Sequence, residues 1–166
     1  MSKAVLISIL PKWCELIASG EKTIEVRKTR PKQEPPFKCY IYETQGKTDT
    51  PWMDEDGHMV FRGRGAVIGE FVCDSILPLS FYASDASFFD TEPPFPVPGT
   101  CLTDKEIAEY LGNGKTGYGK HISNLVIYDV PKKLSEFTGL RKTKFGYAPY
   151  EIKRPPQSWC YVEELP

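Results

Sequence analysis

The chain has 166 residues, of which 40% are apolar and 13% aromatic, and its formal net charge is −1. This length predicts a single domain, residues 1–166, with room for one packed core. The balanced charge excludes a protein that coats nucleic acid nonspecifically, because such binding requires a large basic excess.

Five cysteines form no CxxC pair and there are only two histidines, so neither a disulfide framework nor a metal site is indicated. We expect no metal and no cofactor, and a reducing, cytoplasmic location. No signal-type N-terminus is visible, and no apolar run approaches the eighteen residues of a membrane span, so we expect no membrane partner. The oligomeric state is not predicted.

The first thirty residues predict a strand, a short helix and a second strand. Residues 4–10 are rich in Val, Ile and Leu, which is typical of a strand buried on both faces. Pro11 favours a helix start, so residues 12–19 are predicted to be helical, with Trp13 in the core rather than in a stacking role. Residues 23–30 alternate between a packing face and a face that carries Glu25 and Arg27.

The rest of the chain predicts short strands joined by long loops. Strands are expected at residues 38–44, 59–62, 66–76, 121–130 and 159–163, a helix at 103–112 and one helical turn at 134–137. Gly69 indicates a bulge or a close backbone approach, and Thr103 with Glu106 forms a capping-box pattern.

Four segments are predicted as loops. Residues 45–58 are polar, and residues 81–100 are rich in proline and aromatic residues, which favours an ordered lid or, alternatively, a mobile loop. Residues 113–119 contain Gly-Lys-Thr but lack the glycine spacing of a phosphate loop, so a flexible loop is expected. Residues 138–154 are basic and irregular.

About six strands with two or three short helices predict an α+β fold, a small mixed β-barrel.

The sequence places three charged groups close together: the ammonium donor of Lys22, the carboxylate acceptor of Glu25 and the planar guanidinium group of Arg27. Arg27 suits phosphate, carboxylate or a base edge. Lys22 suits phosphate as a point charge, or acts as nucleophile or base if desolvated. The alternative is a surface ion-pair network worth about 0–1 kcal/mol per pair.

Basic residues gather in two stretches, which predicts a local basic cleft or an ordinary solvated surface. The first stretch contains Lys22, Arg27, Lys28, Arg30 and Lys32, and the second contains Arg141, Lys142, Lys144, Lys153 and Arg154.

The stretch Gly20-Glu21-Lys22-Thr23-Ile24-Glu25-Val26-Arg27 resembles the Gly-x-Lys-x-x-Glu-x-Arg signature of the ASCH domain, in the PUA-like superfamily. The segments His121-Ile122-Ser123 and Arg154-Pro155-Pro156-Gln157-Ser158-Trp159 resemble the small stand-alone bacterial and phage members. The resemblance implies a PUA-like barrel that binds RNA or a nucleotide-like small molecule. It implies that Lys22 and Arg27 meet phosphate or base edges, and that Trp159 or Tyr161 offers stacking worth about 1–3 kcal/mol per base.

One bacterial branch of the family resembled here consists of amidohydrolases of acylated cytidine. In those enzymes a lysine of the motif, a threonine two positions before the motif arginine and a downstream glutamate carry the reaction. The lysine matches Lys22, but Glu25 stands at the threonine position, and the glutamate matches Glu70 or Glu106. An enzyme acting on a modified nucleoside such as N4-acetylcytidine, with Lys22 and Glu25 as catalytic residues, is therefore the alternative to a binding protein. A third hypothesis is protein interaction through residues 81–100.

Overall fold

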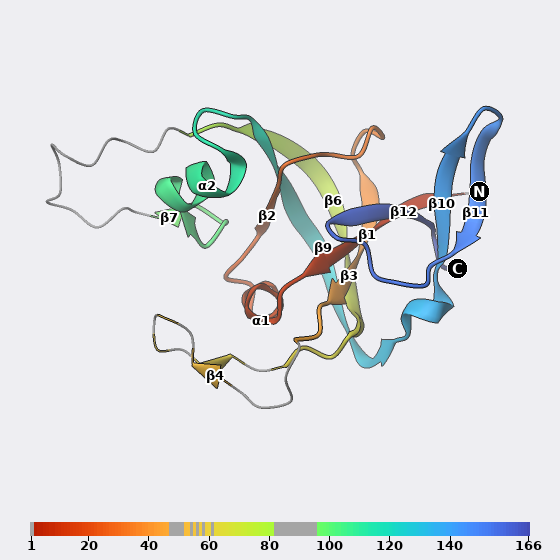
Figure 1. Cartoon of the computed structure of the whole chain (residues 1–166), viewed down its shortest axis with the longest axis horizontal. Coiled ribbons are helices and arrows are strands. Elements are labelled where there is room, and N and C mark those ends of the chain that lie inside the picture. The colour runs from red at the N-terminus through yellow and green to blue at the C-terminus, as the bar shows by residue number, and fades with distance from the viewer. Residues whose placement is uncertain are drawn as a thin grey trace, which may run out of the picture.

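The computed structural model describes residues 2–46, 52–53, 55, 57, 59–60, 62–81 and 96–166. Most of the predicted loop at 45–58 and most of the predicted lid at 81–100 lie outside these residues. The described part is dominated by one eight-stranded sheet (Figure 1). Its strand order is β11 (Gly146–Glu151), β10 (Thr138–Thr143), β12 (Trp159–Glu163), β1 (Lys3–Ile9), β3 (Phe37–Glu43), β6 (Ala66–Leu79), β9 (Gly117–Lys132) and β2 (Ile24–Arg27).

The sheet is not closed into the predicted barrel. Its outermost strands are β11 and β2, which are not paired with each other, and Figure 1 shows β11 at the right-hand end of the molecule and β2 near its middle. Neighbouring strands are antiparallel except for β1 and β3, which are parallel. The sheet holds eight strands where about six were predicted, so the mixed α+β prediction is confirmed only in its coarse form.

Two short hairpins and three helical segments complete the described chain. The hairpins pair β4 (Trp52–Met53) with β5 (Met59–Val60), and β7 (Pro96–Val97) with β8 (Leu102–Thr103). The helical segments are α1 (Pro11–Ala18), α2 (Asp104–Leu111) and the 3₁₀ turn η1 (Leu134–Glu136). Neither α1 nor α2, the α-helices of the described residues, has the length and hydropathy that a membrane crossing requires.

The central strand β1 is buried on both faces, as its sequence predicts. Val5 and Ile7 pack into one apolar cluster, whereas Ala4 and Leu6 pack into another. The same alternation runs along β3, which sends its cysteine and isoleucine into the first cluster and its tyrosines into the second. The first cluster also contains Ile17 of α1 and therefore holds that helix against the sheet.

Local signals in the sequence are confirmed at α1, α2 and Gly69. Pro11 opens α1, and the left-handed Gly20 (φ 83°) follows its end. Thr103 Oγ1 accepts from the Glu106 N–H at 3.1 Å, while Glu106 Oε2 accepts from the Thr103 N–H at 2.7 Å. The β6 register shifts beside Gly69, where a Cβ atom would lie 2.4 Å from the Val126 carbonyl oxygen.

Two loop predictions are wrong in part. Residues 113–116 lie outside any helix or strand, as predicted, but residues 117–119 begin β9 and pair with β6, and Tyr118 and Gly119 also pair with β2. Strand β9 runs one residue beyond Pro131. Residues 138–151 form the β10–β11 hairpin, which turns at the left-handed Gly146 (φ 110°). This hairpin escaped prediction because it lies at the sheet edge, where exposed charged residues replace the apolar alternation and Pro149 is tolerated.

Candidate functional site

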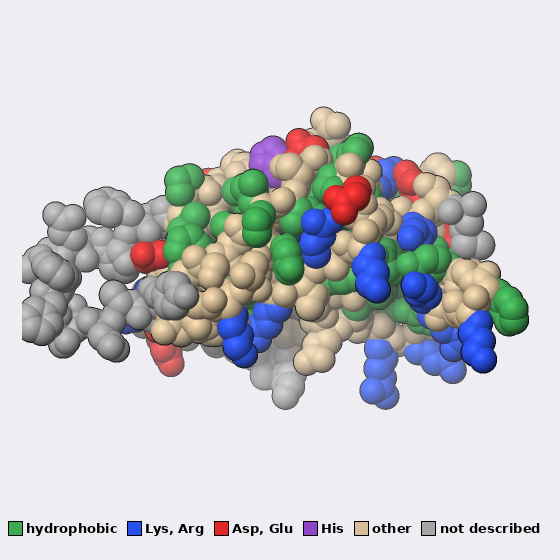
Figure 2. All heavy atoms as spheres, turned by 90° about the horizontal axis from the view of Figure 1, so that it is seen from above, with side chains coloured by type: hydrophobic (Ala, Val, Ile, Leu, Met, Phe, Trp, Pro, Cys, Tyr) green, Lys and Arg blue, Asp and Glu red, His purple; other side chains and the backbone are tan. Residues whose placement is uncertain are grey.

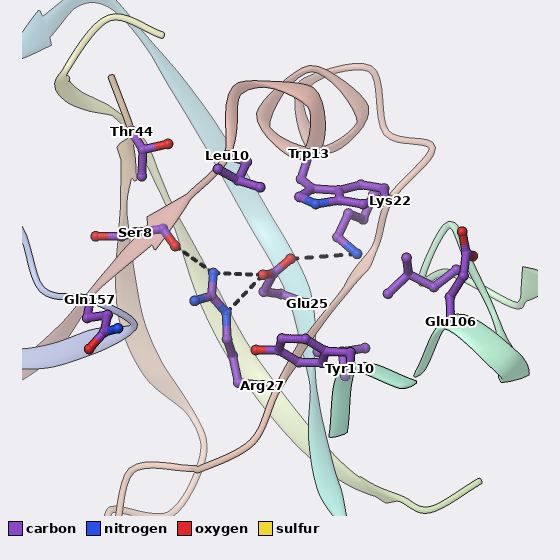
Figure 3. A pocket seen from close by; sticks show the side chains of 12 residues that line it. Ser8, Leu10, Trp13, Lys22, Glu25, Arg27, Thr44, Glu106, Tyr110 and Gln157 are labelled. Atoms are coloured by element: carbon purple, nitrogen blue, oxygen red, sulfur yellow. Dashed lines mark hydrogen bonds and ion pairs between the residues drawn. The ribbon is translucent and has the colours of Figure 1, made fainter. Parts of the chain in front are cut away.

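A pocket of about 450 Å³ lies between α1, α2 and β2 (Figure 3). Pockets of this size accommodate small-molecule ligands. Its floor is formed by the predicted motif, with Lys22, Glu25 and Arg27 all in the lining. Further lining residues come from β1, from the chain after β3, from α2 and from the segment before β12; they include Ser8, Thr44, Glu106 and Gln157.

Glu25 and Arg27 lie on the same side of β2, two residues apart, and their side chains interact directly. Arg27 donates from Nε to Glu25 Oε1 at 3.0 Å, and its Nη2 lies 2.9 Å from the same oxygen. Glu25 is 5% and Arg27 8% exposed, so this pair is not a solvated surface network. Both faces of β2 are therefore buried, because Val26 packs on the opposite side with Ile107 and Leu111.

The remaining donors of Arg27 fix the guanidinium to two other segments. Nη2 donates to the Ser8 carbonyl oxygen at 2.6 Å, and Nη1 donates to Ser158 Oγ at 3.3 Å. These bonds leave one Nη1 hydrogen for a ligand. Arg27 therefore holds the Glu25 carboxylate in place and joins β2 to β1 and to the segment before β12. Its predicted contact with phosphate or base edges stays a prediction.

Lys22 is 2% exposed and directs its ammonium group into the pocket. Nζ donates to the Thr100 carbonyl oxygen at 2.6 Å and lies 3.6 Å from Glu25 Oε2, an ion pair beyond hydrogen-bond distance. Burial lowers the pKa of Lys22, and the neighbouring Glu25 carboxylate opposes that effect. Glu25 Oε2 is buried and has no hydrogen-bond partner among the described residues.

A fourth buried charge, Lys120, lies opposite Glu25 in the β2–β9 register. Lys120 is fully buried, and burial lowers its pKa to about 8. Its Nζ donates to the Thr29 carbonyl oxygen at 3.4 Å. Lys120 does not line the pocket, whose charged lining residues are Lys22 and Arg27 against Glu25 and Glu106. The pocket therefore offers donors and acceptors in balance, and no excess of positive charge.

Two aromatic rings flank the motif on opposite sides of the pocket. Figure 3 shows Trp13 of α1 on one side of Glu25 and Tyr110 of α2 on the other. Trp13 is half-buried and packs against the first cluster, so its predicted core position is confirmed only in part. The Lys22 ammonium lies 5.1 Å from the centroid of the Trp13 ring system.

The predicted stacking residues Trp159 and Tyr161 do not line the pocket. Both pack against the first cluster, and their rings contact each other edge-to-face at 5.3 Å. Of the two candidate downstream glutamates, Glu106 lies in the lining, whereas Glu70 pairs with Lys38 at 3.3 Å.

Sequence reasoning missed several residues of the site. Tyr110 was predicted to be helical, but nothing in the sequence placed α2 beside β2. Lys120 fell at the boundary of a predicted loop, so its position opposite Glu25 was not foreseen. Among the described residues, no group of three or more His, Cys, Asp or Glu side chains is placed to hold a metal ion.

Comparison with known proteins identifies the fold. No protein-family model and no curated protein matches the sequence. The crystal structure of ASCH from Zymomonas mobilis is similar, with 16% identity and a TM-score of 0.51, over 97% of this chain and 88% of that chain. A mutant of that protein gives 16% identity and a TM-score of 0.52, over 97% and 91% of the two chains. The chain therefore has the fold of an ASCH domain, as the motif predicted.

Proposed function

We propose that the pocket binds a nucleobase, either of RNA or of a nucleotide-like small molecule. The observation that carries this proposal is that Glu25 Oε2, buried 3.6 Å from the ammonium group of Lys22, accepts no hydrogen bond from a described residue. A buried acceptor without a hydrogen bond costs about 1–3 kcal/mol, and a ligand donor recovers part of that cost. The site therefore presents one acceptor and a neighbouring donor to the same ligand edge.

Cytosine and adenine carry a matching edge. Each has an exocyclic amine that donates to Glu25 Oε2, next to a ring nitrogen that accepts from Lys22 Nζ. Trp13 and Tyr110 supply aromatic surface for the planar ring, as in other pockets that read a base by its edge and its faces. The ASCH-domain fold and the match at the motif add support to this proposal.

The test is a calorimetric titration with cytidine and uridine monophosphate. Uracil presents a carbonyl in place of the exocyclic amine, so we expect wild type to bind the cytidine nucleotide about 10–100-fold more tightly. Glu25→Gln should narrow this difference, because an amide both donates and accepts. Glu34→Gln is the matched control, since Glu34 is largely exposed and pairs with Arg30. Equal cytidine nucleotide binding by wild type and Glu25→Gln would refute the proposal.

A hydrolase acting on an acylated nucleoside is the second candidate, and the lowered pKa of Lys22 favours it. A desolvated lysine beside one carboxylate, with Glu106 also in the lining, is a plausible acid–base arrangement. Turnover of N4-acetylcytidine that Lys22→Ala abolishes and Lys12→Ala leaves unchanged supports this candidate. Turnover that persists in Lys22→Ala excludes it at this site.

A further inference from the structure

The turn of the β7–β8 hairpin, at the described end of the predicted lid, contacts the motif at the floor of the pocket. The N–H groups of Thr23 and Ile24 both donate to the Gly99 carbonyl oxygen, at 2.8 and 2.9 Å. The next carbonyl oxygen along the turn, that of Thr100, accepts from Lys22 Nζ at 2.6 Å. One turn therefore holds both the backbone at the start of β2 and the ammonium group of the site.

Thr100 lies fully buried in this turn, and its hydroxyl group fixes the shape of the turn. Oγ1 donates to the Val97 carbonyl oxygen at 2.8 Å and accepts from the Leu102 N–H at 3.1 Å. The two neighbours of Thr100 have left-handed backbones, Gly99 with φ 80° and Cys101 with φ 56°. Because a left-handed φ is uncommon for a residue with a side chain, the surrounding contacts impose this conformation. The turn therefore sets the direction of the Thr100 carbonyl oxygen.

Burial leaves Lys22 with protein groups as its neighbours. Figure 2 shows lysine and arginine side chains that project from one face of the molecule, whereas Lys22 is 2% exposed. Besides the Thr100 carbonyl oxygen, its ammonium group has the ring system of Trp13 at 5.1 Å and the carboxylate of Glu25 beside it. The hydrogen bonds of this ammonium group are therefore made within the protein or to a ligand.

The position of Lys22 decides whether Glu25 keeps an oxygen free of hydrogen bonds. Arg27 donates to Oε1 of Glu25 from Nε at 3.0 Å, and its Nη2 lies 2.9 Å from the same oxygen. Lys22 Nζ lies 3.6 Å from the other oxygen, Oε2, which accepts no hydrogen bond from a described residue. Coulomb attraction in a buried site draws an ammonium group onto a carboxylate. The separation of 3.6 Å is therefore maintained by a competing contact, and the hydrogen bond to Thr100 is that contact.

From these contacts we propose that Thr100 is a positioning residue, whose carbonyl oxygen holds the Lys22 ammonium group back from Glu25 and so keeps Glu25 Oε2 free for a ligand donor. The proposal rests on the proposed function, because that oxygen is the acceptor for the base. When the turn is displaced, Lys22 moves onto Oε2 and closes the ion pair, and the site loses its acceptor.

The test begins with Thr100→Val, which keeps the shape of threonine but removes the hydroxyl group. The buried Leu102 N–H then lacks its acceptor, so the turn loses the bond that shapes it. Thr100→Ser keeps a hydroxyl group and should rescue the wild-type behaviour. Thr116→Val, a change at an exposed threonine outside the turn, is the matched control.

Gly99→Ala displaces the same turn without removing a hydroxyl group, and it serves if Thr100→Val does not fold. A Cβ atom at Gly99 would lie 2.6 Å from Thr23 Oγ1, and the left-handed φ disfavours alanine. Both turn variants should have the same effect on Lys22.

The first measurement is the crystal structure of each turn variant. We expect the distance between Lys22 Nζ and Glu25 Oε2 to fall from 3.6 Å to about 2.7–2.9 Å, the length of a charge-assisted hydrogen bond. The second measurement is calorimetric titration of the folded variants with cytidine and uridine monophosphate. The preference for the cytidine nucleotide should fall about tenfold in the turn variants, since one hydrogen bond to the base is lost. A purely structural role for Thr100 would lower stability and leave this preference unchanged.

Three outcomes overturn the proposal: a Lys22–Glu25 separation that stays at 3.6 Å in both turn variants, an unchanged cytidine preference in a variant with a closed ion pair, or an equal loss of preference in Thr116→Val. Failure of the proposed function is distinguishable. It appears as a closed Lys22–Glu25 pair in the turn variants, with no binding of either nucleotide by wild type.

Discussion

The pocket and the exposed basic segments, residues 28–32 and 141–144, both carry basic side chains, but they hold them in opposite ways. In the pocket, Lys22 and Arg27 are 2% and 8% exposed and are fixed by hydrogen bonds to carbonyl oxygens and to Glu25. In the exposed segments, Lys32 and Lys142 are solvent-exposed and form no ion pair with another described residue. Buried, fixed charges select one ligand geometry and couple to folding, whereas exposed charges add salt-dependent affinity and little stability.

The largest expected effect is the loss of Arg27. Arg27→Ala leaves the Glu25 carboxylate buried without its two guanidinium contacts, and removes the links to Ser8 and Ser158. We expect the free energy of unfolding in urea to fall by about 3–5 kcal/mol. Arg30→Ala, which removes a partly exposed pair with Glu34, should cost about 0–1 kcal/mol. Equal losses in the two variants would contradict the contrast between buried and exposed charge.

The buried Lys120 should make the stability of the protein depend on pH. Lys120 has a folded pKa of about 8 against 10.5 for the unfolded chain, so between these values the unfolded chain binds more protons and stability rises with pH. The free energy of unfolding of wild type should therefore rise by about 2–3 kcal/mol relative to that of Lys120→Met between about pH 7 and 10. Urea unfolding across this range measures it. A difference between Lys120→Met and wild type that stays flat across this pH range would refute the prediction.

A smaller effect is expected at the start of α2, the helix that carries Tyr110 and Glu106 to the pocket. Thr103→Ala removes the hydroxyl that accepts from the Glu106 N–H. Thermal unfolding should report a loss of about 1 kcal/mol. Thr116→Ala, at an exposed position outside the helix, is the control and should leave stability unchanged. No difference between the two variants would show that the cap does not stabilise α2.

The smallest effect is expected at the tip of the β10–β11 hairpin. Phe145 is 98% exposed, so Phe145→Ala should change the free energy of unfolding by less than about 0.5 kcal/mol. Phe137 is 3% exposed and contacts Tyr40 edge-to-face at 4.9 Å, so Phe137→Ala should cost about 3–5 kcal/mol. Chemical denaturation of both variants tests this contrast. A large loss in Phe145→Ala would mean that the tip packs against the protein.

Local sequence signals predicted most of the secondary structure correctly. Pro11 with Gly20, the Thr103–Glu106 capping box and the alternation along β3 are decided by neighbours in the chain. The β10–β11 hairpin was missed because Arg141, Lys142 and Lys144 and the glycine and proline residues within it hide the alternation that places Leu140 and Tyr150 against the protein. The prediction of a closed barrel was wrong because closure depends on whether the two edge strands pair. No local sequence pattern shows that β11 and β2 stay unpaired.

The sequence predicted the floor of the site but not its walls. Lys22, Glu25 and Arg27 are close in sequence, so one turn and one strand bring them together. Tyr110 and Lys120 approach them only through tertiary packing and through the β2–β9 register. The predicted aromatic pair of Trp159 and Tyr161 lies outside the pocket lining, and Tyr161 accepts a hydrogen bond from the Lys32 N–H. The ligand-binding role of these two residues remains a prediction.

The central claim is that the free oxygen of Glu25 receives a base donor inside the pocket. A crystal structure of the protein soaked with cytidine monophosphate tests it most directly. The account predicts the cytosine ring beside Trp13 and Tyr110, with its exocyclic amine at hydrogen-bond distance from Glu25 Oε2 and its edge toward Lys22 Nζ. A nucleotide bound only outside the pocket, or one whose phosphate and not its base meets Glu25 and Lys22, would contradict it.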